Sequence, residues 1–370
     1  MTDRLRWECS FLCPPSDFVP FWKDLVQSSR RSMLLISGRG FDPRTVEAPS
    51  ALAAGGVDVR ELRLLRLVDR YNPSHPAEQT ARAEENERRI RALFPAAETR
   101  VLEIEIRTED GRTSGGLQVA QACVEFGPFD RFTDVIVDIT ALPSSIFFPL
   151  IGTLLSERDQ ETTPTWNLHC IVCENATLDE RILAEGGDRA ERVYGFGGEY
   201  ESAAELDAVR VWAPVLGERQ AESLRKIDDA VGPSEVKPIV PFPSADPRRG
   251  DRLLSEYRSL LVDSWDVDPQ GFIYAHEQDP FDLYLQLGRL YRDYVAVLEP
   301  IGTARTVLSS HTSKLLSLGV LLAAFEHRLP VMHVEPTGYQ GTDLDQYSDQ
   351  NQLFEVWLAG EAYEEVPHRT

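Results

Sequence analysis

Two segments of the sequence combine arginine, aspartate and small residues in a way that suits the binding of an anion. One follows the apolar run 32–37 and contains Gly38, Arg39, Gly40, Asp42 and Arg44. The other follows the apolar run 237–242 and contains Asp246, Arg248 and Arg249. Arginine presents several N–H donors to a phosphate or carboxylate, so we predict that both segments contact an anionic ligand. The glycine spacing matches neither a dinucleotide fingerprint nor a P-loop, and an aspartate before proline is also typical of a plain turn.

Two further segments place hydroxyl groups before an apolar stretch of helical length. The first contains Thr140, Ser144 and Ser145, and the second contains Ser309, Ser310, Thr312, Ser313 and Lys314. The N-terminus of a helix carries a partial positive charge and unpaired N–H groups, which favour an anion. We therefore predict ligand contacts here as well. A hydroxyl at such a place, for instance that of Ser144 or Thr312, is equally typical of a helix cap.

The sequence offers few residues for catalysis. Asp138 and His311 are the candidates, and Ser309 and Ser310 directly precede His311. Because adjacent residues of an extended segment point in opposite directions, a serine–histidine nucleophile here would need a partner from elsewhere in the fold. We leave open whether the protein is an enzyme.

The cysteines indicate neither a disulfide framework nor a metal site. Their number, five, is odd, which argues against a set of disulfides. The run from His169 through Cys170 to Cys173 is strand-like, so its two cysteines point to opposite faces and do not share a metal ion. We predict no metal and no cofactor.

Short apolar runs alternate with helical patterns along the chain, which predicts βαβ units and parallel sheets. The predicted strands are 32–37, 59–68, 99–106, 134–140, 166–173, 237–242, 271–275, 305–309 and 330–334. The predicted helices are 77–93, 116–126, 144–158, 217–231, 252–264, 280–298 and 313–326. One more helix is expected around Phe354, Trp357 and Leu358.

In each half an Asp-Pro-Arg tripeptide follows the first predicted strand, and a hydroxyl-rich segment later precedes an apolar helix. Because these features repeat in the same order, we predict an α/β fold with two Rossmann-like parallel-sheet halves related by internal duplication. The predicted parts are an N-terminal leader 1–31, a first half 32–175, a helical and Gly-rich connector 176–235, a second half 236–340 and an acidic C-terminal segment 341–370. Ligands of open parallel sheets lie beyond the carboxyl ends of the strands. The candidate segments would then face one cleft, suited to a ligand with two or more phosphates.

Composition excludes some functions. The chain of 370 residues has 60 acidic and 38 basic residues and a formal net charge of −22. Such acidity argues against a broad nucleic-acid surface, which needs basic residues to neutralise phosphates. No apolar stretch is long enough to span a membrane and no signal-peptide pattern is present, so we expect a cytoplasmic protein.

Two motifs resemble the Asp-[Leu/Ile]-Thr-Gly-Gly-Thr-Lys element of CRISPR-associated Rossmann fold (CARF) domains. They are Val137-Asp138-Ile139-Thr140 and Thr312-Ser313-Lys314, and each leads into a helix. The first has Ala141-Leu142-Pro143 where the family has glycines and a lysine, and the second lacks the Asp-x-Thr and the glycines. The predicted duplication is similar to the fused two-copy SAVED domains. The resemblance covers roughly 31–175 and 236–340 and implies a cleft that binds a cyclic oligonucleotide.

These observations favour a sensing module that binds an anionic nucleotide-type ligand, such as a cyclic or linear oligonucleotide, and signals to a protein partner. The resemblance implies a setting in prokaryotic antiviral defence, with the effector on a separate subunit. Two alternatives are kept: a phosphodiesterase or other hydrolase acting on a nucleotide, and a ligand-free adaptor subunit of a multiprotein complex.

Overall fold

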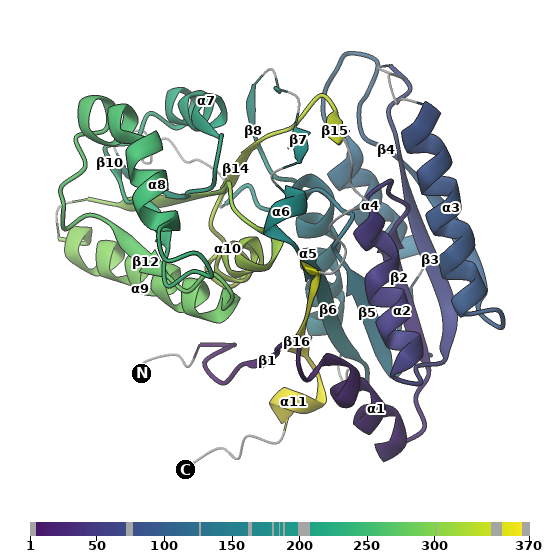
Figure 1. Cartoon of the computed structure of the whole chain (residues 1–370). Coiled ribbons are helices and arrows are strands. Elements are labelled where there is room, and N and C mark those ends of the chain that lie inside the picture. The colour runs from purple at the N-terminus through teal and green to yellow at the C-terminus, as the bar shows by residue number, and fades with distance from the viewer. Residues whose placement is uncertain are drawn as a thin grey trace, which may run out of the picture. The chain divides into compact units, whose positions relative to one another are not determined.

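The chain divides into two units, each with one seven-stranded sheet, as the computed structural model shows (Figure 1). Unit 1 comprises Met1–Glu8 and Glu185–Thr337, and unit 2 comprises Cys9–Ala184 and Gly338–Thr370. The structure describes residues 5–71, 77–125, 127–161, 165–179, 181–184, 186–187, 189–198, 208–300, 302–341 and 350–364. Among these residues, no helix combines the length and the apolar character that crossing a membrane requires.

The sheet of unit 2 has the strand order β1-β16-β6-β5-β2-β3-β4. Its parallel strands are β2 (Met33–Gly38), β3 (Val59–Val68), β4 (Glu98–Glu105), β5 (Asp134–Asp138) and β6 (Asn167–Glu174). Strand β16 (Gln352–Ala359) is antiparallel to β6, and β1 (Phe11–Cys13) is antiparallel to β16. Every residue of β2 and β5 is buried, as expected for strands covered on both faces.

Helices cover the sheet of unit 2. Helices α1 (Phe18–Ser28), α2 (Glu47–Ala54) and α3 (Ala77–Leu93) share one apolar core with the strands, in which Trp22, Leu52 and Ile90 are fully buried. Helices α4 (Gly115–Glu125) and α5 (Ser144–Gln160) pack on each other. Strands β3 and β4 add to one side of β2, whereas β5 and β6 add to its other side. Because the crossovers between parallel strands are right-handed, this reversal places α4 and α5 on the face of the sheet opposite to α2 and α3. The short elements are a 3-10 helix (Pro43–Val46), α6 (Ala176–Asp179), α11 (Glu361–Glu364) and the pair β7 (Ile182–Ala184) and β15 (Tyr339–Gly341).

The sheet of unit 1 has the order β12-β11-β9-β13-β14-β8, with β10 paired to β9. Its parallel strands are β9 (Val209–Val215), β10 (Glu235–Val236), β11 (Ile239–Pro241), β12 (Ile273–Ala275), β13 (Ala304–Ser310) and β14 (Val331–Val334). Strand β8 (Ala190–Arg192) is antiparallel to β14. Helices α7 (Ala221–Val231) and α8 (Arg249–Glu256) join one core around Trp212 and Tyr257. A π-helical stretch (Ser259–Ser264) follows α8, and α9 (Pro280–Leu298) packs on α10 (Lys314–His327).

The two sheets share one strand order. Ranked by chain position and leaving out the two-residue β10, the parallel strands run 3-2-1-4-5 from β4 to β6 and again from β12 to β14. An antiparallel strand follows the fifth in each unit, β16 in one and β8 in the other. The predicted α/β fold with two Rossmann-like, mostly parallel sheets is confirmed. A common origin of the two units stays a prediction.

The shared order corrects the predicted match between the two Asp-Pro-Arg segments. Asp42 lies after β2, the first strand of its series, whereas Asp246 lies after β11, the second strand of its series. The first strand of unit 1 is β9, which lies inside the predicted connector 176–235. The two hydroxyl-rich loops do match in position, because both follow the fourth strand, β5 or β13.

The two ends of the chain both contribute to the sheet of unit 2. The predicted leader 1–31, expected as a strand, a loop and a helix, contains strand β1 and helix α1 of this unit. The expected helix around Phe354 and Trp357 is the strand β16, which pairs with β6 along its length. Residues 354–359 are all buried, so their apolar character reflects a strand covered on both faces rather than one face of a helix.

Candidate functional site

In unit 2 the loop after β2 is held together by its own charges. The Asp42 carboxylate accepts a hydrogen bond from the Arg44 backbone N–H at 2.8 Å and from the Arg44 guanidinium at 2.7 Å. A second carboxylate, of Asp179, lies 2.8 Å from the other end of the guanidinium. Burial alone would lower the pKa of Arg44, but Asp42 and Asp179 raise it. Arg44 is only 4% exposed, so its donors face protein carboxylates in this structure.

The glycines of this loop serve close packing. A Cβ on Gly38 would lie 2.9 Å from the Leu142 side chain, and one on Gly40 would lie 2.9 Å from Ala141. The loop after β2 therefore touches the loop after β5 directly. Asn86 of α3 donates to the Gly40 carbonyl at 3.0 Å. Arg39 forms an ion pair with Glu87 of the same helix.

The loop after β5 is also bound internally. Asp138 is completely buried, accepts from the Ser37 hydroxyl at 3.0 Å and accepts from the Thr140 N–H at 3.0 Å. The Thr140 hydroxyl accepts from the Cys173 N–H of β6 at 3.0 Å. Ser144 and Ser145 begin α5. Complete burial keeps the Asp138 carboxylate from contact with a substrate in this structure.

In unit 1 the two predicted arginines differ in their ion pairs: Arg249 has two carboxylate partners, and Arg248 has no close ion pair with a described residue. Arg249 lies between Glu218, at 2.8 Å, and Glu277. Burial alone would raise the pKa of Glu218, but Arg249 lowers it. Arg248 is exposed, and its backbone N–H donates to Asp246 at 2.9 Å. Its guanidinium forms no hydrogen bond or close ion pair with a described residue, although the backbone N–H and the charge of Arg248 both help to lower the pKa of Asp246. The outer face of this guanidinium is open to an anion.

The loop between β13 and α10 carries the predicted hydroxyl groups. The Ser310 hydroxyl lies 2.7 Å from that of Ser317. Ser313 caps α10 by accepting from the Leu316 N–H at 3.3 Å, and Lys314 is the first residue of this helix. The Thr312 Oγ1 atom is buried and makes no hydrogen bond to any described residue. A buried hydroxyl without a partner costs free energy, and an external partner would reach it only after a movement of the loop between β13 and α10.

The serine–histidine pair of this loop is not arranged as a nucleophile. The Ser309 hydroxyl accepts from the Trp212 indole N–H at 3.0 Å and lies 3.2 Å from His311 Nε2. Ser309 is completely buried. Burial, with a contribution from His333, lowers the pKa of His311 to about 4. A neutral imidazole with so low a pKa is a weak general base, and the hydroxyl that it faces is inaccessible.

Both units close the crevice between their first and fourth strands by loop contact. In unit 1 a Cβ on Gly217, which follows β9, would lie 1.6 Å from the His311 carbonyl oxygen. Gly38 and Gly40 make the corresponding approach in unit 2. The groups open to a ligand therefore lie on the rim of the carboxyl edge, not in the crevice itself.

Sequence reasoning missed the carboxylates that hold the predicted arginines. Asp179 is the last residue of the short helix α6, and Glu218 and Glu277 come from the loops after β9 and β12. No local motif marks them. Their only signal is their place directly after β9, after β12 or within α6.

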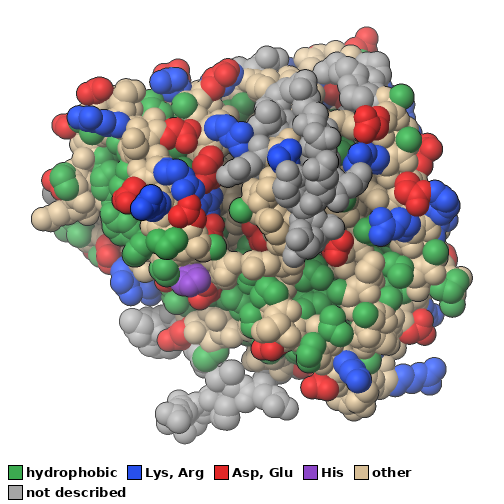
Figure 2. All heavy atoms as spheres, in the orientation of Figure 1, with side chains coloured by type: hydrophobic (Ala, Val, Ile, Leu, Met, Phe, Trp, Pro, Cys, Tyr) green, Lys and Arg blue, Asp and Glu red, His purple; other side chains and the backbone are tan. Residues whose placement is uncertain are grey.

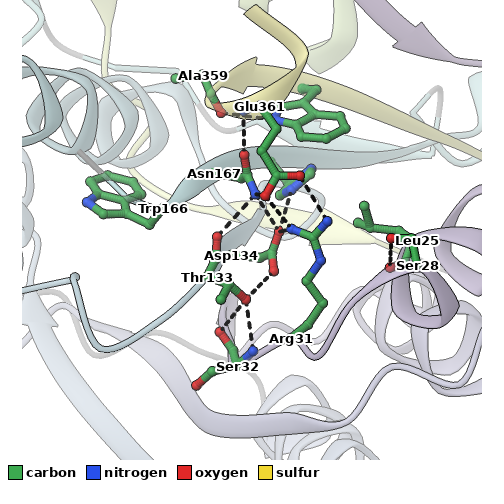
Figure 3. Close-up of polar contacts among 12 residues, drawn as sticks. Leu25, Ser28, Arg31, Ser32, Thr133, Asp134, Trp166, Asn167, Ala359 and Glu361 are labelled. Atoms are coloured by element: carbon green, nitrogen blue, oxygen red, sulfur yellow. Dashed lines mark hydrogen bonds and ion pairs between the residues drawn. The ribbon is translucent and has the colours of Figure 1, made fainter. Parts of the chain in front are cut away.

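A second polar cluster lies at the amino ends of β5 and β6 (Figure 3). His169 lies 2.6 Å from Glu355 and 3.3 Å from Asp134, and all three side chains are completely buried. Asp134 also accepts from Asn167 at 2.9 Å and lies 3.3 Å from Arg31. Burial alone would lower the pKa of His169, but Glu355 and Asp134 raise it to about 9. With no exposure, the cluster joins β16 and β5 to β6 and is not placed to receive a substrate.

The cysteines agree with the strand prediction for 166–173. Cys170 and Cys173 are free thiols buried in β6. In the described part of the chain, no group of histidine, cysteine and carboxylate side chains is arranged to hold a metal ion.

The comparisons with known proteins include two distant structural similarities. The sequence matches no protein-family model and no curated protein. Among solved structures, a universal stress protein from Archaeoglobus fulgidus DSM 4304 is similar over 84% of this chain and 97% of that chain, with 10% identity and a TM-score of 0.25. The CcbJ methyltransferase from Streptomyces caelestis is similar over 51% of this chain and 62% of that chain, with 16% identity and a TM-score of 0.20. Similarities at this level support no conclusion about this chain.

Proposed function

We propose that the protein is a sensing module that binds a small anionic ligand of the nucleotide type at the carboxyl edge of the unit 1 sheet. One observation carries the proposal: this edge holds two polar groups with unused binding capacity. They are the guanidinium of Arg248 and the buried hydroxyl of Thr312. The other predicted arginines, Arg39, Arg44 and Arg249, are already engaged by carboxylates.

The spacing of the two groups supports a ligand with more than one phosphate. Arg248 lies after β11 and Thr312 after β13, and β9 separates these strands. Neighbouring strands are about 4.8 Å apart, so the two loops begin about 10 Å from each other. The N-terminus of α10, a helix of 14 residues, adds a partial positive charge. A nucleoside polyphosphate or an oligonucleotide, which carries several phosphates along its length, would be able to contact both loops.

The contacts of the same loops supply a route for a signal. The loop that carries Thr312 presses against Gly217, and the next residue, Glu218, holds Arg249 at the start of α8. A ligand that shifts residues 309–314 would therefore also shift α8. The resemblance to CARF and SAVED domains supports this reading, and with it the proposals of an oligonucleotide ligand, a partner protein and a setting in antiviral defence.

The test begins with the purified protein. Native mass spectrometry, followed by denaturation, would detect a co-purified nucleotide, and a thermal-shift panel of mono-, di- and cyclic nucleotides would find ligands that bind afterwards. We expect Arg248→Ala and Thr312→Val each to weaken binding about tenfold, a loss typical of one charged or one buried hydrogen bond. Without ligand, Thr312→Val should melt at the same temperature as the natural protein or higher, because it removes an unsatisfied hydroxyl.

Arg289→Ala is the matched control for Arg248→Ala, because Arg289 is an exposed arginine of the same unit that lies within α9. It should leave binding unchanged. Absence of any ligand and any thermal shift would refute the proposal and favour the adaptor reading. Consumption of the ligand on incubation would favour the hydrolase.

A further inference from the structure

Two aromatic side chains lie exposed at the carboxyl edge of unit 1, close to the loop that carries Arg248. Phe242 follows β11 and is 50% exposed, and Tyr274 lies in β12 and is 49% exposed. Their ring centroids are 6.1 Å apart and their planes meet at 76°. Large aromatic side chains are usually much more buried than this. A pair of them on one rim indicates a surface that is covered when a ligand binds.

Hydrogen bonds hold this pair and the following loop in one arrangement. The Phe242 N–H donates to the Ala275 carbonyl of β12 at 2.7 Å. The Glu277 carboxylate accepts from the Ala245 N–H at 2.6 Å and also pairs with Arg249. The loop is therefore fixed between the ends of two neighbouring strands. A site that is formed in advance loses little entropy when its ligand binds.

The aromatic pair and Arg248 are within reach of one ligand. Six residue steps separate Phe242 from Arg248, which is at most about 20 Å for an extended chain. The loop folds back on itself, because the Arg249 N–H donates to the Asp246 carbonyl at 2.9 Å. Figure 2 shows hydrophobic side chains next to basic and acidic ones over the part of unit 1 that contains α8 and β12.

We propose that Phe242 and Tyr274 form a stacking platform for the nucleobase of the ligand whose phosphates Arg248 binds. This inference rests on the proposed function and adds the base as a recognised group. Every nucleobase has a π-face that can stack on an aromatic ring. Inorganic polyphosphates and sugar phosphates, which have no base, would lose this contact.

The experiment compares ATP with inorganic triphosphate, which carries a similar charge and no base. Isothermal titration calorimetry of the full chain would measure both probes on the natural protein, on Phe242→Ala and on Phe242→Trp. Stacking of one base is worth at least about a fivefold change in affinity. We expect ATP to bind about tenfold more tightly than triphosphate to the natural protein and to Phe242→Trp. In Phe242→Ala the two probes should bind equally, with the triphosphate affinity unchanged.

Tyr194→Ala is the matched control, because Tyr194 is a similarly exposed aromatic residue of unit 1 (47%) that lies outside this loop. It should leave both affinities as they are, and all variants should keep the melting temperature of the natural protein. Equal binding of ATP and triphosphate to the natural protein would overturn the platform and leave the proposed function standing. A failure of both probes to bind would overturn the proposed function and the platform with it.

Discussion

The arginines of the candidate loops differ chiefly in whether they form ion pairs with carboxylates. Arg44 and Arg249 each form ion pairs with two carboxylates, whereas the Arg248 guanidinium forms no close ion pair with a described residue. An arginine between two carboxylates holds its loop in shape. An exposed arginine whose guanidinium forms no close ion pair can bind an anion, which is why the proposed site is centred on Arg248.

The charge of His169 makes the stability of the protein depend on pH. Its pKa rises from the ordinary value of 6.5 to about 9 in the folded protein, because Glu355 and Asp134 outweigh the effect of burial. A raised pKa stabilises the folded state fully below pH 6.5, and this contribution is lost as the pH rises to 9. We expect the free energy of unfolding to fall by about 3 kcal/mol over this range, as measured by urea denaturation at a series of pH values.

The variant His169→Gln isolates this effect. It should lower stability by about 3–5 kcal/mol near neutral pH, because it leaves Glu355 and Asp134 buried without a cation. It should also remove most of the pH dependence between 6.5 and 9. The control His276→Gln changes an exposed histidine and should alter neither quantity. A natural protein of constant stability over this range would show that His169 is neutral when folded.

At the scale of elements, contact between loops defines the carboxyl edge of unit 1. Gly217 has an ordinary backbone conformation, so the requirement for glycine comes from the His311 carbonyl oxygen, 1.6 Å from the place of a Cβ. We expect Gly217→Ala to lower the free energy of unfolding by about 3 kcal/mol, because the loops must separate to admit the methyl group. Thermal and urea denaturation measure this loss.

The control for this variant is Gly197→Ala. A Cβ at Gly197 would meet no atom within 4 Å, and Gly197 does not lie in the left-handed region. Its stability should change by less than about 1 kcal/mol. If Gly217→Ala were equally mild, the loops after β9 and β13 would move independently, and the proposed route for a signal would be lost.

Local sequence predicted most elements and missed those that depend on distant pairing. Strand β3 was predicted with its observed limits, because an apolar run between polar segments is a local signal. Strand β9 was missed because Arg210 and Pro214 interrupt its apolar pattern and Gly-rich sequence lies upstream of it. Strand β16 was missed because Glu355 breaks its apolar pattern, and only the fold reveals that His169 faces this carboxylate.

The same limit applies to the candidate site. The sequence identified the hydroxyl groups and arginines of the loops that follow strands. It could not show that Glu218 and Glu277 use up Arg249, since they lie 31 and 28 residues away along the chain. Nor could it show that Gly217 closes the crevice, because that depends on β9 lying beside β13.

At the scale of the whole molecule, each unit has its own core, so we expect a core substitution to destabilise mainly the unit in which it lies. Trp357 packs beside His169 in unit 2, and Trp212 is buried in unit 1 and donates to Ser309. Replacement of either by alanine should cost about 3–5 kcal/mol. Hydrogen exchange read by mass spectrometry should show the lost protection in β1, β6 and β16 for Trp357→Ala.

The companion variant Trp212→Ala serves as the reciprocal control. Its loss of protection should lie in β9, β13 and α7, the elements of unit 1 that surround this side chain. If each variant lowered the hydrogen-exchange protection of both units to the same extent, the chain would unfold in one cooperative step. The two units would then not differ in stability.

The path of the chain has a consequence for its synthesis. Strand β6 ends at Glu174, and the strand that covers its edge, β16, begins at Gln352. The ribosome makes all of the main segment of unit 1, Glu185–Thr337, between the two. At 5–20 residues per second, β6 remains an open edge for roughly 10 to 35 seconds. The growing chain therefore has its greatest need of protection from wrong strand pairing during this interval.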